Sequence, residues 1–257
     1  MSVADQACKA EQFRALHLRG KPLVLLNVWD AGSAKAVAAG GAKAIATSSW
    51  SVANSNGFAD GERIPLALAI ENLRRIVATV EVPVSVDLES GYADRADCVE
   101  ETIGLAIEAG AVGCNLEDSF PTTGKLRETV EQVDRIRYAR RAAGATKIRF
   151  FINARTDVFF QQPPEKHDEN LVVQAIHRAR AYAEAGADGL FAPGLASLSL
   201  IGRLAEESPL PVNIMVGDST PCLCELAERG IARVSHGPRP YLLAMKALEK
   251  AARTASS

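Results

Sequence analysis

Two carboxylates stand two residues apart at the end of an apolar run. The segment SVDLESGYAD places Asp87 and Glu89 where an extended chain points both side chains to the same face. Like charges on one face repel, so a cation or water should lie between them. Hard cations prefer carboxylates and water, so we predict a site for Mg²⁺ or Mn²⁺ here. The alternative is a pair of solvated loop acids or salt-bridge partners.

A second acidic segment and a basic residue follow two later apolar runs. Glu117 and Asp118 end the run in CNLED, and Arg155 ends the run in INARTD. A guanidinium binds carboxylates through two parallel hydrogen bonds, so we predict that Arg155 binds a substrate carboxylate or a developing enolate oxygen. The alternative is a structural ion pair with Asp157 or Glu117, and both roles can hold together.

Other polar residues also follow apolar runs. In TSSW, Ser48, Ser49 and the backbone N–H groups can hold a carboxylate, although ordinary turn chemistry explains the same residues. Asn213 is a further candidate for substrate binding. His236 stands near the C-terminus in VSHGPRP, and its histidine is either catalytic or structural.

The elements that position these residues alternate along the whole chain. Helix-like segments end in glycine and pass at once into β-rich runs, as in EAGAVGCNLED and EAGADGLFAPG. Their near-continuous hydrophobicity is typical of strands buried on both faces of a parallel sheet. Eight such runs are present, at residues 22–29, 42–48, 82–88, 112–117, 148–154, 188–192, 211–216 and 231–235.

Eight strands alternating with amphipathic stretches predict one (β/α)₈ barrel over residues 1–257. We expect an N-terminal helix at about 8–19 and a C-terminal helix at about 239–254. A doubly wound sheet usually carries a glycine-rich fingerprint after its first strand, and NVWDAGSA lacks one. Because barrel enzymes use the carboxyl ends of their strands, the acids, serines and arginine should meet at one face.

Composition excludes several other classes of protein. The chain has 257 residues, of which 47% are hydrophobic and 23% charged, and its formal net charge is −2. This balance is typical of a globular protein and provides no basic surface for nucleic acid. The N-terminus resembles no signal peptide, and no apolar run approaches the ~18 residues of a membrane helix. We therefore expect a cytoplasmic protein with no membrane partner.

The cysteines form no recognisable framework. Five are present, at positions 8, 98, 114, 222 and 224, and none forms a CxxC pair. We therefore expect neither a zinc site nor a disulfide framework, and we interpret the cysteines as mostly buried small hydrophobic residues. Cys222 and Cys224, in TPCLCEL, are assigned to packing on this basis.

Six motifs occur in order between residues 22 and 217: NVWDAGSA, TSSWSVANSNGFADG, VSVDLESGYAD, NLEDS, INARTD and EAGADGLF. In this combination the chain resembles the isocitrate lyase and phosphoenolpyruvate mutase superfamily. The resemblance implies a Mg²⁺-dependent enzyme that acts on a 2-oxo acid or forms one. Such an enzyme makes or breaks the C–C or P–C bond beside an enolate.

The resemblance also implies roles for the acids. Asp87, the first acid of its motif, matches the direct metal ligand. Glu89 and Glu117 then complete the metal site by holding metal-bound waters, as does Asp60. Arg155 matches the motif arginine, and with Asp60 and Glu117 it forms the predicted catalytic group.

The substrate site is assigned in the same way. Ser48, Ser49 and Trp50 match the positions that grip the substrate carboxylate. The full set of predicted substrate-binding residues is Ser48, Ser49, Trp50, Asp87, Arg155 and Asn213. The substrate is expected to be a small carboxylic acid.

Departures from the superfamily narrow the activity. Isocitrate and methylisocitrate lyases carry K-K-C-G-H in a long loop, whereas NLEDSFPTTGKLRETV passes into a helix without it. Phosphonate-handling members have a lysine and an asparagine in this loop and a histidine after strand six, where this chain has Pro193. The chain thus resembles a phosphonomutase-like branch that lacks the K-K-C-G-H loop. Its second motif acid is Glu89, where many relatives have Asp.

A divalent ion chelated by the carboxylate and 2-oxo oxygens of a substrate such as oxaloacetate would stabilise the enolate left when a C–C bond breaks. The first hypothesis is therefore a metal-dependent lyase or decarboxylase. The alternatives are a phosphonomutase or phosphonopyruvate hydrolase, and a barrel that binds small carboxylates without turnover. Residues 119–126, rich in Pro, Thr and Gly, are a candidate lid.

The resemblance further implies a homodimer or homotetramer. In such an assembly the last helix is exchanged between subunits. The segment PYLLAMKALEKAAR is amphipathic and suits this role, although it would equally close its own barrel.

Overall fold

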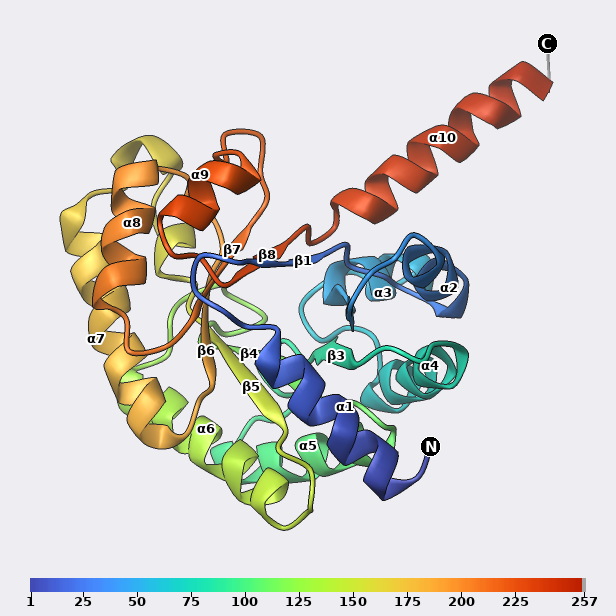
Figure 1. Ribbon diagram of the computed structural model, residues 1–257, viewed down its shortest axis with the longest axis horizontal. Helices are drawn as coiled ribbons and strands as arrows, with labels where there is room; N and C mark the ends of the chain where they lie inside the picture. Colours follow the sequence, from blue (N-terminus) through green and yellow to red (C-terminus); the bar gives the residue numbers. More distant parts are fainter. Residues whose placement is uncertain (256–257) are drawn as a thin grey trace.

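The computed structural model describes residues 1–255, and residues 256–257 of the predicted domain lie outside the described residues. Eight parallel strands pair in the order β1-β8-β7-β6-β5-β4-β3-β2 (Figure 1). A single bridge between Val28 and Thr47 joins the two ends of the sheet. The predicted (β/α)₈ barrel is confirmed. The strands are β1 Leu23–Leu25, β2 Ile45–Ala46, β3 Val84–Asp87, β4 Gly113–Glu117, β5 Phe151–Arg155, β6 Gly189–Ala192, β7 Val212–Met215 and β8 Arg233–Ser235.

Helices follow every strand, and all of them except α10 lie around the barrel (Figure 1). They are α1 Val3–Ala15, α2 Ala31–Ala39, α3 Ser49–Ser55, α4 Leu66–Thr79, α5 Val99–Glu108, α6 Thr129–Gly144, α7 Glu169–Ala185, α8 Leu198–Glu207, α9 Leu223–Glu228 and α10 Arg239–Ala255. Short 3₁₀ helices occupy η1 Ala96–Cys98, η2 Val158–Phe160 and η3 Pro164–Lys166.

The first helix begins earlier than expected. The predicted span was about 8–19, whereas α1 covers Val3–Ala15. The Ser2 hydroxyl accepts a hydrogen bond from the Asp5 N–H at 3.1 Å and donates to the Asp5 carboxylate at 2.7 Å. This reciprocal capping sets the helix start ahead of its first buried apolar residue, which is why the apolar pattern placed it too late. Phe13 of α1 then packs edge-on against Phe151, at a centroid distance of 5.6 Å.

Inside the barrel, polar side chains form a connected layer. The Asn115 side-chain oxygen accepts from the Asn153 amide at 2.9 Å and faces the guanidinium of the fully buried Arg233 at 3.4 Å. The Asn213 and Ser235 side chains bond to each other at 3.1 Å. The apolar residues of the same strands face the surrounding helices. Asn213 therefore belongs to the barrel interior.

The expectation for the cysteines is wrong. Cys222 and Cys224 form a disulfide, and Cys8 and Cys98 are exposed, so that only Cys114 is buried as a small hydrophobic residue. The Cα atoms of Cys222 and Cys224 are 5.5 Å apart, within the range that a disulfide spans. Local backbone conformation at the start of α9 decides this distance, and a search for CxxC spacing misses it.

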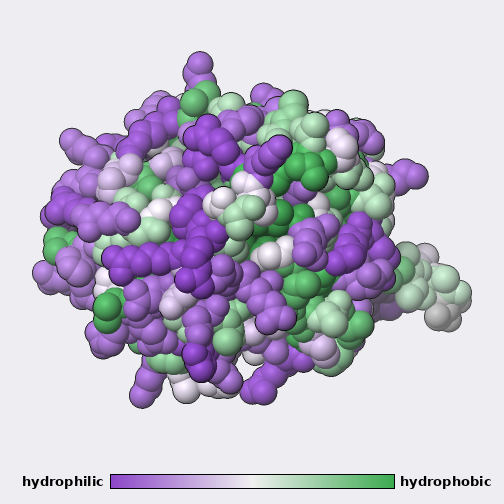
Figure 2. Space-filling model, turned by 90° about the horizontal axis from the view of Figure 1, so that it is seen from below, coloured by the Kyte–Doolittle hydropathy of each residue, from purple (hydrophilic) through white to green (hydrophobic). Residues whose placement is uncertain are grey.

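The last helix leaves the barrel. In Figure 1, α10 extends away from the strands, and none of its residues is buried. Leu242, Leu243 and Leu248 are 42%, 72% and 63% exposed. The face in Figure 2 is covered mainly by hydrophilic side chains, and the end of α10 projects from it at the right. None of the helices in residues 1–255 combines the length and apolar character needed to cross a membrane.

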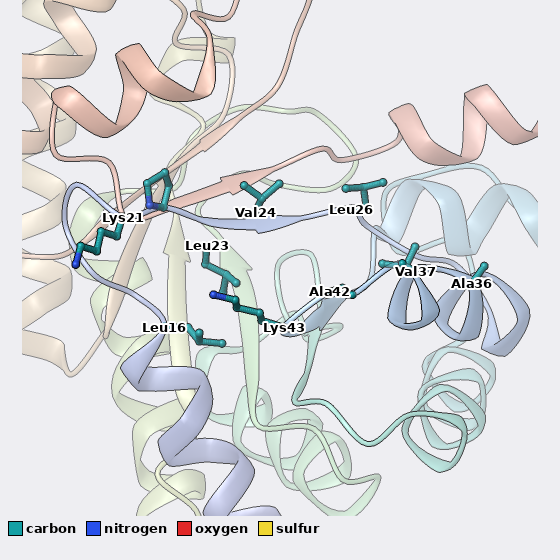
Figure 3. A pocket seen from close by; sticks show the side chains of 12 residues that line it. Leu16, Lys21, Leu23, Val24, Leu26, Ala36, Val37, Ala42 and Lys43 are labelled. Carbon is teal, nitrogen blue, oxygen red and sulfur yellow. The ribbon is translucent and has the colours of Figure 1, made fainter.

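A groove of about 600 Å³ lies beside β1, on the outer side of the barrel (Figure 3). Val24 and Leu26 of β1 and its extension line one part, and Ala36 and Val37 of α2 line another. In a (β/α)₈ barrel, the helix after the last strand normally covers this position. The groove is therefore the apolar surface that α10 leaves uncovered.

His17 lies half-buried under the barrel as a neutral base. Its ring stacks on Phe151 at 4.1 Å, and Nδ1 donates to the Phe13 carbonyl at 2.8 Å. Burial, followed by the charges of Arg233 and Arg14, lowers the pKa of His17 from 6.5 to about 3. In the unfolded chain the His17 imidazole is therefore protonated below about pH 6.5, whereas in the folded protein it is protonated only below about pH 3. The resulting stability is complete above pH 6.5 and falls by about 1.4 kcal/mol per unit as the pH drops.

Replacing His17 with Gln should reduce the acid sensitivity of the fold. Between pH 6.5 and 4.5, the free energy of unfolding of the wild-type chain should fall by about 2–3 kcal/mol more than that of His17→Gln. Urea titrations at several pH values measure this slope. His177→Gln, at an exposed histidine, is the control and should keep the wild-type slope. Equal slopes for wild type and His17→Gln would contradict the assignment.

Candidate active site

The carboxyl ends of the strands surround a cavity of about 320 Å³. Residues from the loops after β2, β3, β4 and β5 line it, as expected for the active face of a barrel. Its charged lining residues are Asp60, Glu89, Glu117, Arg155 and Asp157. Four acids thus share the cavity with one guanidinium.

Asp87 ends β3 beside this cavity with one free oxygen. Its Oδ2 accepts from the N–H and the hydroxyl of Ser49 at 3.2 and 3.0 Å. Its own N–H donates to the Thr47 hydroxyl at 2.8 Å. Oδ1 is buried and has no hydrogen-bond partner among the described residues. A buried carboxylate oxygen without a partner is costly, so this atom is ready to accept a cation.

The orientation of Glu89 is set by the loop between α3 and α4, which contains Glu62, a residue that the sequence did not point to. The Glu62 N–H donates to Glu89 Oε2 at 2.7 Å, and the Tyr92 hydroxyl donates to Oε1 at 3.2 Å. The Glu62 carboxylate in turn accepts from the N–H groups of Ser90 and Tyr92 at 3.0 and 2.9 Å. Glu62, Glu89 and Tyr92 all have positive φ, at 59°, 51° and 51°. Such strain persists only where surrounding contacts hold it, and it is typical of functional sites.

Arg155 is tied to two acids at once. Its Nη1 lies 2.7 Å from Glu117 Oε2, while Nε and Nη2 contact the two oxygens of Asp157 at 2.7 and 3.1 Å. The Ser119 hydroxyl lies 3.1 Å from Glu117 and 2.6 Å from Asp157. The predicted structural ion pair is therefore present with both acids. It holds the guanidinium at the cavity wall, where the predicted substrate contact would occur.

The excess of acids raises several pKa values. Burial, followed by the Asp60 and Asp87 carboxylates, raises the pKa of Glu89 to about 8. Burial and Asp87 also raise the pKa of Asp60. Burial raises the pKa of Glu117, against the opposing charge of Arg155. Burial and the neighbouring carboxylates therefore oppose ionisation of these carboxyls, and a divalent cation would favour their charged forms.

The donors in the site fit Mg²⁺. Within residues 1–255, no group of three His, Cys, Asp or Glu side chains is arranged to hold a metal ion directly. Mg²⁺ usually keeps several waters and binds through one or two carboxylates. The unpartnered Asp87 oxygen suits direct coordination, and Glu89, Glu117 and Asp60 suit contacts through water. The arrangement predicted from the sequence is thus compatible with the geometry.

Four of the predicted substrate-binding residues do not line this cavity: Asp87, which lies beside it, and Ser48, Trp50 and Asn213. Ser48 caps α3, where its hydroxyl accepts from the Ser51 N–H at 3.4 Å. Trp50 packs against Tyr241 of α10, at a centroid distance of 5.9 Å. Asn213 lies in the barrel interior, as described above. Of the predicted carboxylate-binding serines, Ser49 lines the cavity, and its polar groups already hold Asp87.

Asp118 and His236 do not line the cavity. Asp118 is fully buried and accepts from the Tyr182 hydroxyl at 2.8 Å and from Arg178 at 3.1 Å. It therefore ties β4 to α7. His236 is half-buried after β8, its N–H donates to the Leu25 carbonyl, and burial lowers the pKa of its side chain.

The candidate lid covers one side of the cavity. An antiparallel bridge joins Ser119 to Leu126 at the base of the loop. Phe120 and Pro121 line the cavity, and the ring of Phe120 packs on Arg127 at 4.0 Å. A Cβ atom at Gly61, whose φ is +87°, would approach the Pro121 carbonyl to 2.9 Å. The glycine after Asp60 therefore allows this loop to lie close to the site.

Several known proteins are similar to this chain. A solved structure from Burkholderia cenocepacia J2315, described as a candidate phosphonomutase, is 57% identical with a TM-score of 0.95, over 97% of this chain and 99% of that one. The 2-methylisocitrate lyase of Salmonella typhimurium is 31% identical, over 94% of this chain and 81% of its own length. The oxaloacetate decarboxylase of Pseudomonas savastanoi is 27% identical, over 72% of this chain and 62% of its own length.

More distant structures share the fold. One is a phosphonopyruvate hydrolase in complex with oxalate and Mg²⁺, which is 22% identical with a TM-score of 0.80, over 94% of this chain and 84% of that one. Residues 13–256 match the family model for phosphoenolpyruvate phosphomutase. With the barrel, the motif acids and these relatives together, the chain belongs to the phosphoenolpyruvate phosphomutase family, within the isocitrate lyase superfamily of lyases and mutases.

Proposed function

We propose that this protein is a Mg²⁺-dependent lyase that cleaves the C–C bond beside an enolate in a small 2-oxo or 2-hydroxy acid. Decarboxylation of oxaloacetate is the specific reaction proposed, and Mn²⁺ should replace Mg²⁺. The observation that carries the proposal is the unpartnered oxygen of Asp87 beside a cavity where four acids face one arginine. The acids outnumber the single guanidinium, so the site carries excess negative charge until a divalent cation enters.

Each residue then has a defined task. When bound, a divalent ion would stabilise the negative charge that develops on the substrate oxygens. Asp87 would hold it directly, while Glu89 and Glu117 would accept hydrogen bonds from its waters. Arg155, fixed by two acids, would face the developing enolate and neutralise part of its charge. Phe120, on the lid, would limit the access of bulk water.

The second candidate is a phosphonomutase or phosphonopyruvate hydrolase. The 57% identity to a candidate phosphonomutase favours it. Against it stands Pro193, which occupies the place of a histidine in the phosphonate-handling pattern. Turnover of phosphonopyruvate without turnover of oxaloacetate would support this candidate.

The test is a substrate panel with Mg²⁺ and with EDTA. The panel contains oxaloacetate, other 2-oxo and 2-hydroxy diacids, isocitrate and phosphonopyruvate. We expect pyruvate release from oxaloacetate, its loss in EDTA, and its recovery on addition of Mg²⁺ or Mn²⁺. Activity that persists in EDTA would exclude the metal mechanism. Metal-dependent binding without turnover of any acid would instead identify a carboxylate-binding barrel.

Glu62 should contribute to metal affinity by holding Glu89. Glu62→Ala removes the acceptor for the Ser90 and Tyr92 N–H groups and should weaken Mn²⁺ binding by about ten- to a hundredfold. Glu62→Gln keeps an acceptor oxygen and should have a smaller effect. Calorimetric titration with Mn²⁺ measures both, with Glu71→Ala at an exposed acid as the control. Wild-type affinity in Glu62→Ala would show that the loop does not support the site.

We also propose that the protein forms a homodimer or homotetramer in which α10 of one copy covers the groove beside β1 of another. Two observations support this: α10 has no buried residue, and the groove is lined by apolar residues of β1 and α2 (Figure 3). The double variant Leu243→Glu, Leu248→Glu should reduce the mass measured by light scattering to that of one chain. Lys250→Glu on the same helix should leave it unchanged. A monomeric wild-type chain would contradict the proposal.

A further inference from the structure

Three aromatic rings connect the last helix to the active face. Tyr241, in the first turn of α10, packs edge-on against Trp29 at 5.1 Å and against Trp50 at 5.9 Å. Trp29 follows β1 and Trp50 lies in the first turn of α3, so the contact joins the last helix to the segments that follow β1 and β2. Figure 1 shows the start of α10 close to α3. These are the only two tryptophans of the sequence.

Trp29 is the fixed end of this bridge. Its N–H donates to the Ser33 hydroxyl at 3.1 Å, and its carbonyl accepts from the Asn72 amide at 2.8 Å. Its side chain packs against a small buried cluster that contains Val52 and Ile64. Tyr241 therefore packs against the well-held ring of Trp29, and its second contact restrains the ring of Trp50.

Trp50 is adjacent to the residue that supports Asp87. Ser49 directs both its N–H and its hydroxyl to Asp87 Oδ2, which leaves Oδ1 as the free oxygen. Ser49 and Trp50 are consecutive in the first turn of α3, so a contact that holds this turn at Trp50 also restrains the neighbouring backbone that carries the Ser49 donors. The contact with Tyr241 thus bears on the geometry of Asp87.

Other contacts at the root of α10 are weaker. Arg239 pairs with Asp218 at 2.6 Å, but Asp218 is almost fully exposed, and exposed pairs contribute little. Aromatic pairs, in contrast, add specific geometry to the apolar area that they bury. Tyr241 is therefore the main side-chain link between the start of α10 and the body of the barrel.

We infer that Tyr241 is a positioning residue, which through Trp50 and Ser49 holds Asp87 in the orientation that the metal site requires. The inference rests on the proposed function for the role of Asp87. It makes the C-terminal helix, through its first turn, part of the support of the active site. If the ring contact only packed the helix root, its loss would leave ligand binding unchanged.

The test compares Tyr241→Ala, Tyr241→Phe and Tyr138→Ala. Tyr241→Phe keeps the ring, and Tyr138→Ala removes a tyrosine of α6 that packs on Arg141, away from both tryptophans. The first readout is acrylamide quenching of tryptophan emission in the ligand-free protein, which reports the two rings directly. The second is calorimetric binding of Mn²⁺, and of oxalate in the presence of Mg²⁺. Far-UV circular dichroism checks that each variant is folded.

Tyr241→Ala should increase quenching and weaken binding of Mn²⁺ and oxalate by about five- to tenfold, the scale of two aromatic contacts. Tyr241→Phe and Tyr138→Ala should match the wild type in both readouts. The inference is overturned if Tyr241→Ala leaves quenching unchanged, or if it increases quenching with wild-type Mn²⁺ affinity. A failure of the proposed function would differ, because the wild-type protein itself would bind neither Mn²⁺ nor oxalate.

Discussion

Replacing Asp87 with Asn should lower kcat/KM by about a thousandfold or more, since the variant loses the charge that holds the metal. The amide oxygen of Asn can still accept from the Ser49 N–H, so the local backbone should remain as it is. The stability should be unchanged or slightly raised, because Asp87 repels Asp60 and Glu89 in the metal-free protein. A loss of activity without a loss of stability is therefore the expected signature.

The measurement pairs steady-state kinetics with Mn²⁺ titration and urea unfolding. Asp134→Asn, which neutralises an exposed acid of α6, is the matched control and should behave as the wild type in all three. Substantial Mg²⁺-dependent activity in Asp87→Asn would exclude Asp87 as the ligand. A large loss of stability would show that its role is mainly structural.

Arg155→Lys should lower kcat/KM by about a hundred- to a thousandfold. Lysine is a point charge and cannot meet Glu117 and both oxygens of Asp157 at the same time. The remaining charge still offsets part of the acid cluster, so the fold should survive. Arg155→Met removes the charge altogether and should cost about 3–5 kcal/mol of stability, because two buried carboxylates lose their partner.

These two variants separate the structural role of Arg155 from the chemical one. Urea unfolding gives the stability of each variant, and kinetics with oxaloacetate give the activity. Arg75→Lys, in an exposed ion pair on α4, is the control for replacing arginine with lysine and should behave as the wild type. If Arg155→Lys retains wild-type kcat/KM, the guanidinium serves only to hold Glu117 and Asp157.

The barrel could be predicted because its signal is local and repeated. All eight strands fall within the predicted apolar runs, except that β5 extends one residue further, to Arg155. Helices that end at or near a glycine precede β2, β4, β5, β6 and β8, and sequence patterns express both features directly. The start of α1 was missed because a capping pair determines it ahead of the apolar residues. The Cys222–Cys224 disulfide was missed because it depends on the backbone at the start of α9.

The candidate site was predictable only in part. The sequence placed Asp87, Glu89, Glu117 and Arg155 at strand ends, and the structure brings them to one face. The strand-end pattern alone did not distinguish Glu117 from the consecutive Asp118, and the family resemblance selected Glu117. Along β4, alternation turns Glu117 toward the cavity, while Asp118 contacts Arg178 and Tyr182 of α7.

The sequence by itself determined the fold and the chemical types that its active face presents, because both follow from residues near one another in the chain. The tertiary structure decided which partners those residues meet. Glu62 reaches Glu89 across 27 positions, and Tyr241 reaches Trp50 across a still longer stretch of chain. Such contacts exist only once the barrel has closed, since closure brings loops from distant strands to one rim, and no local pattern encodes them.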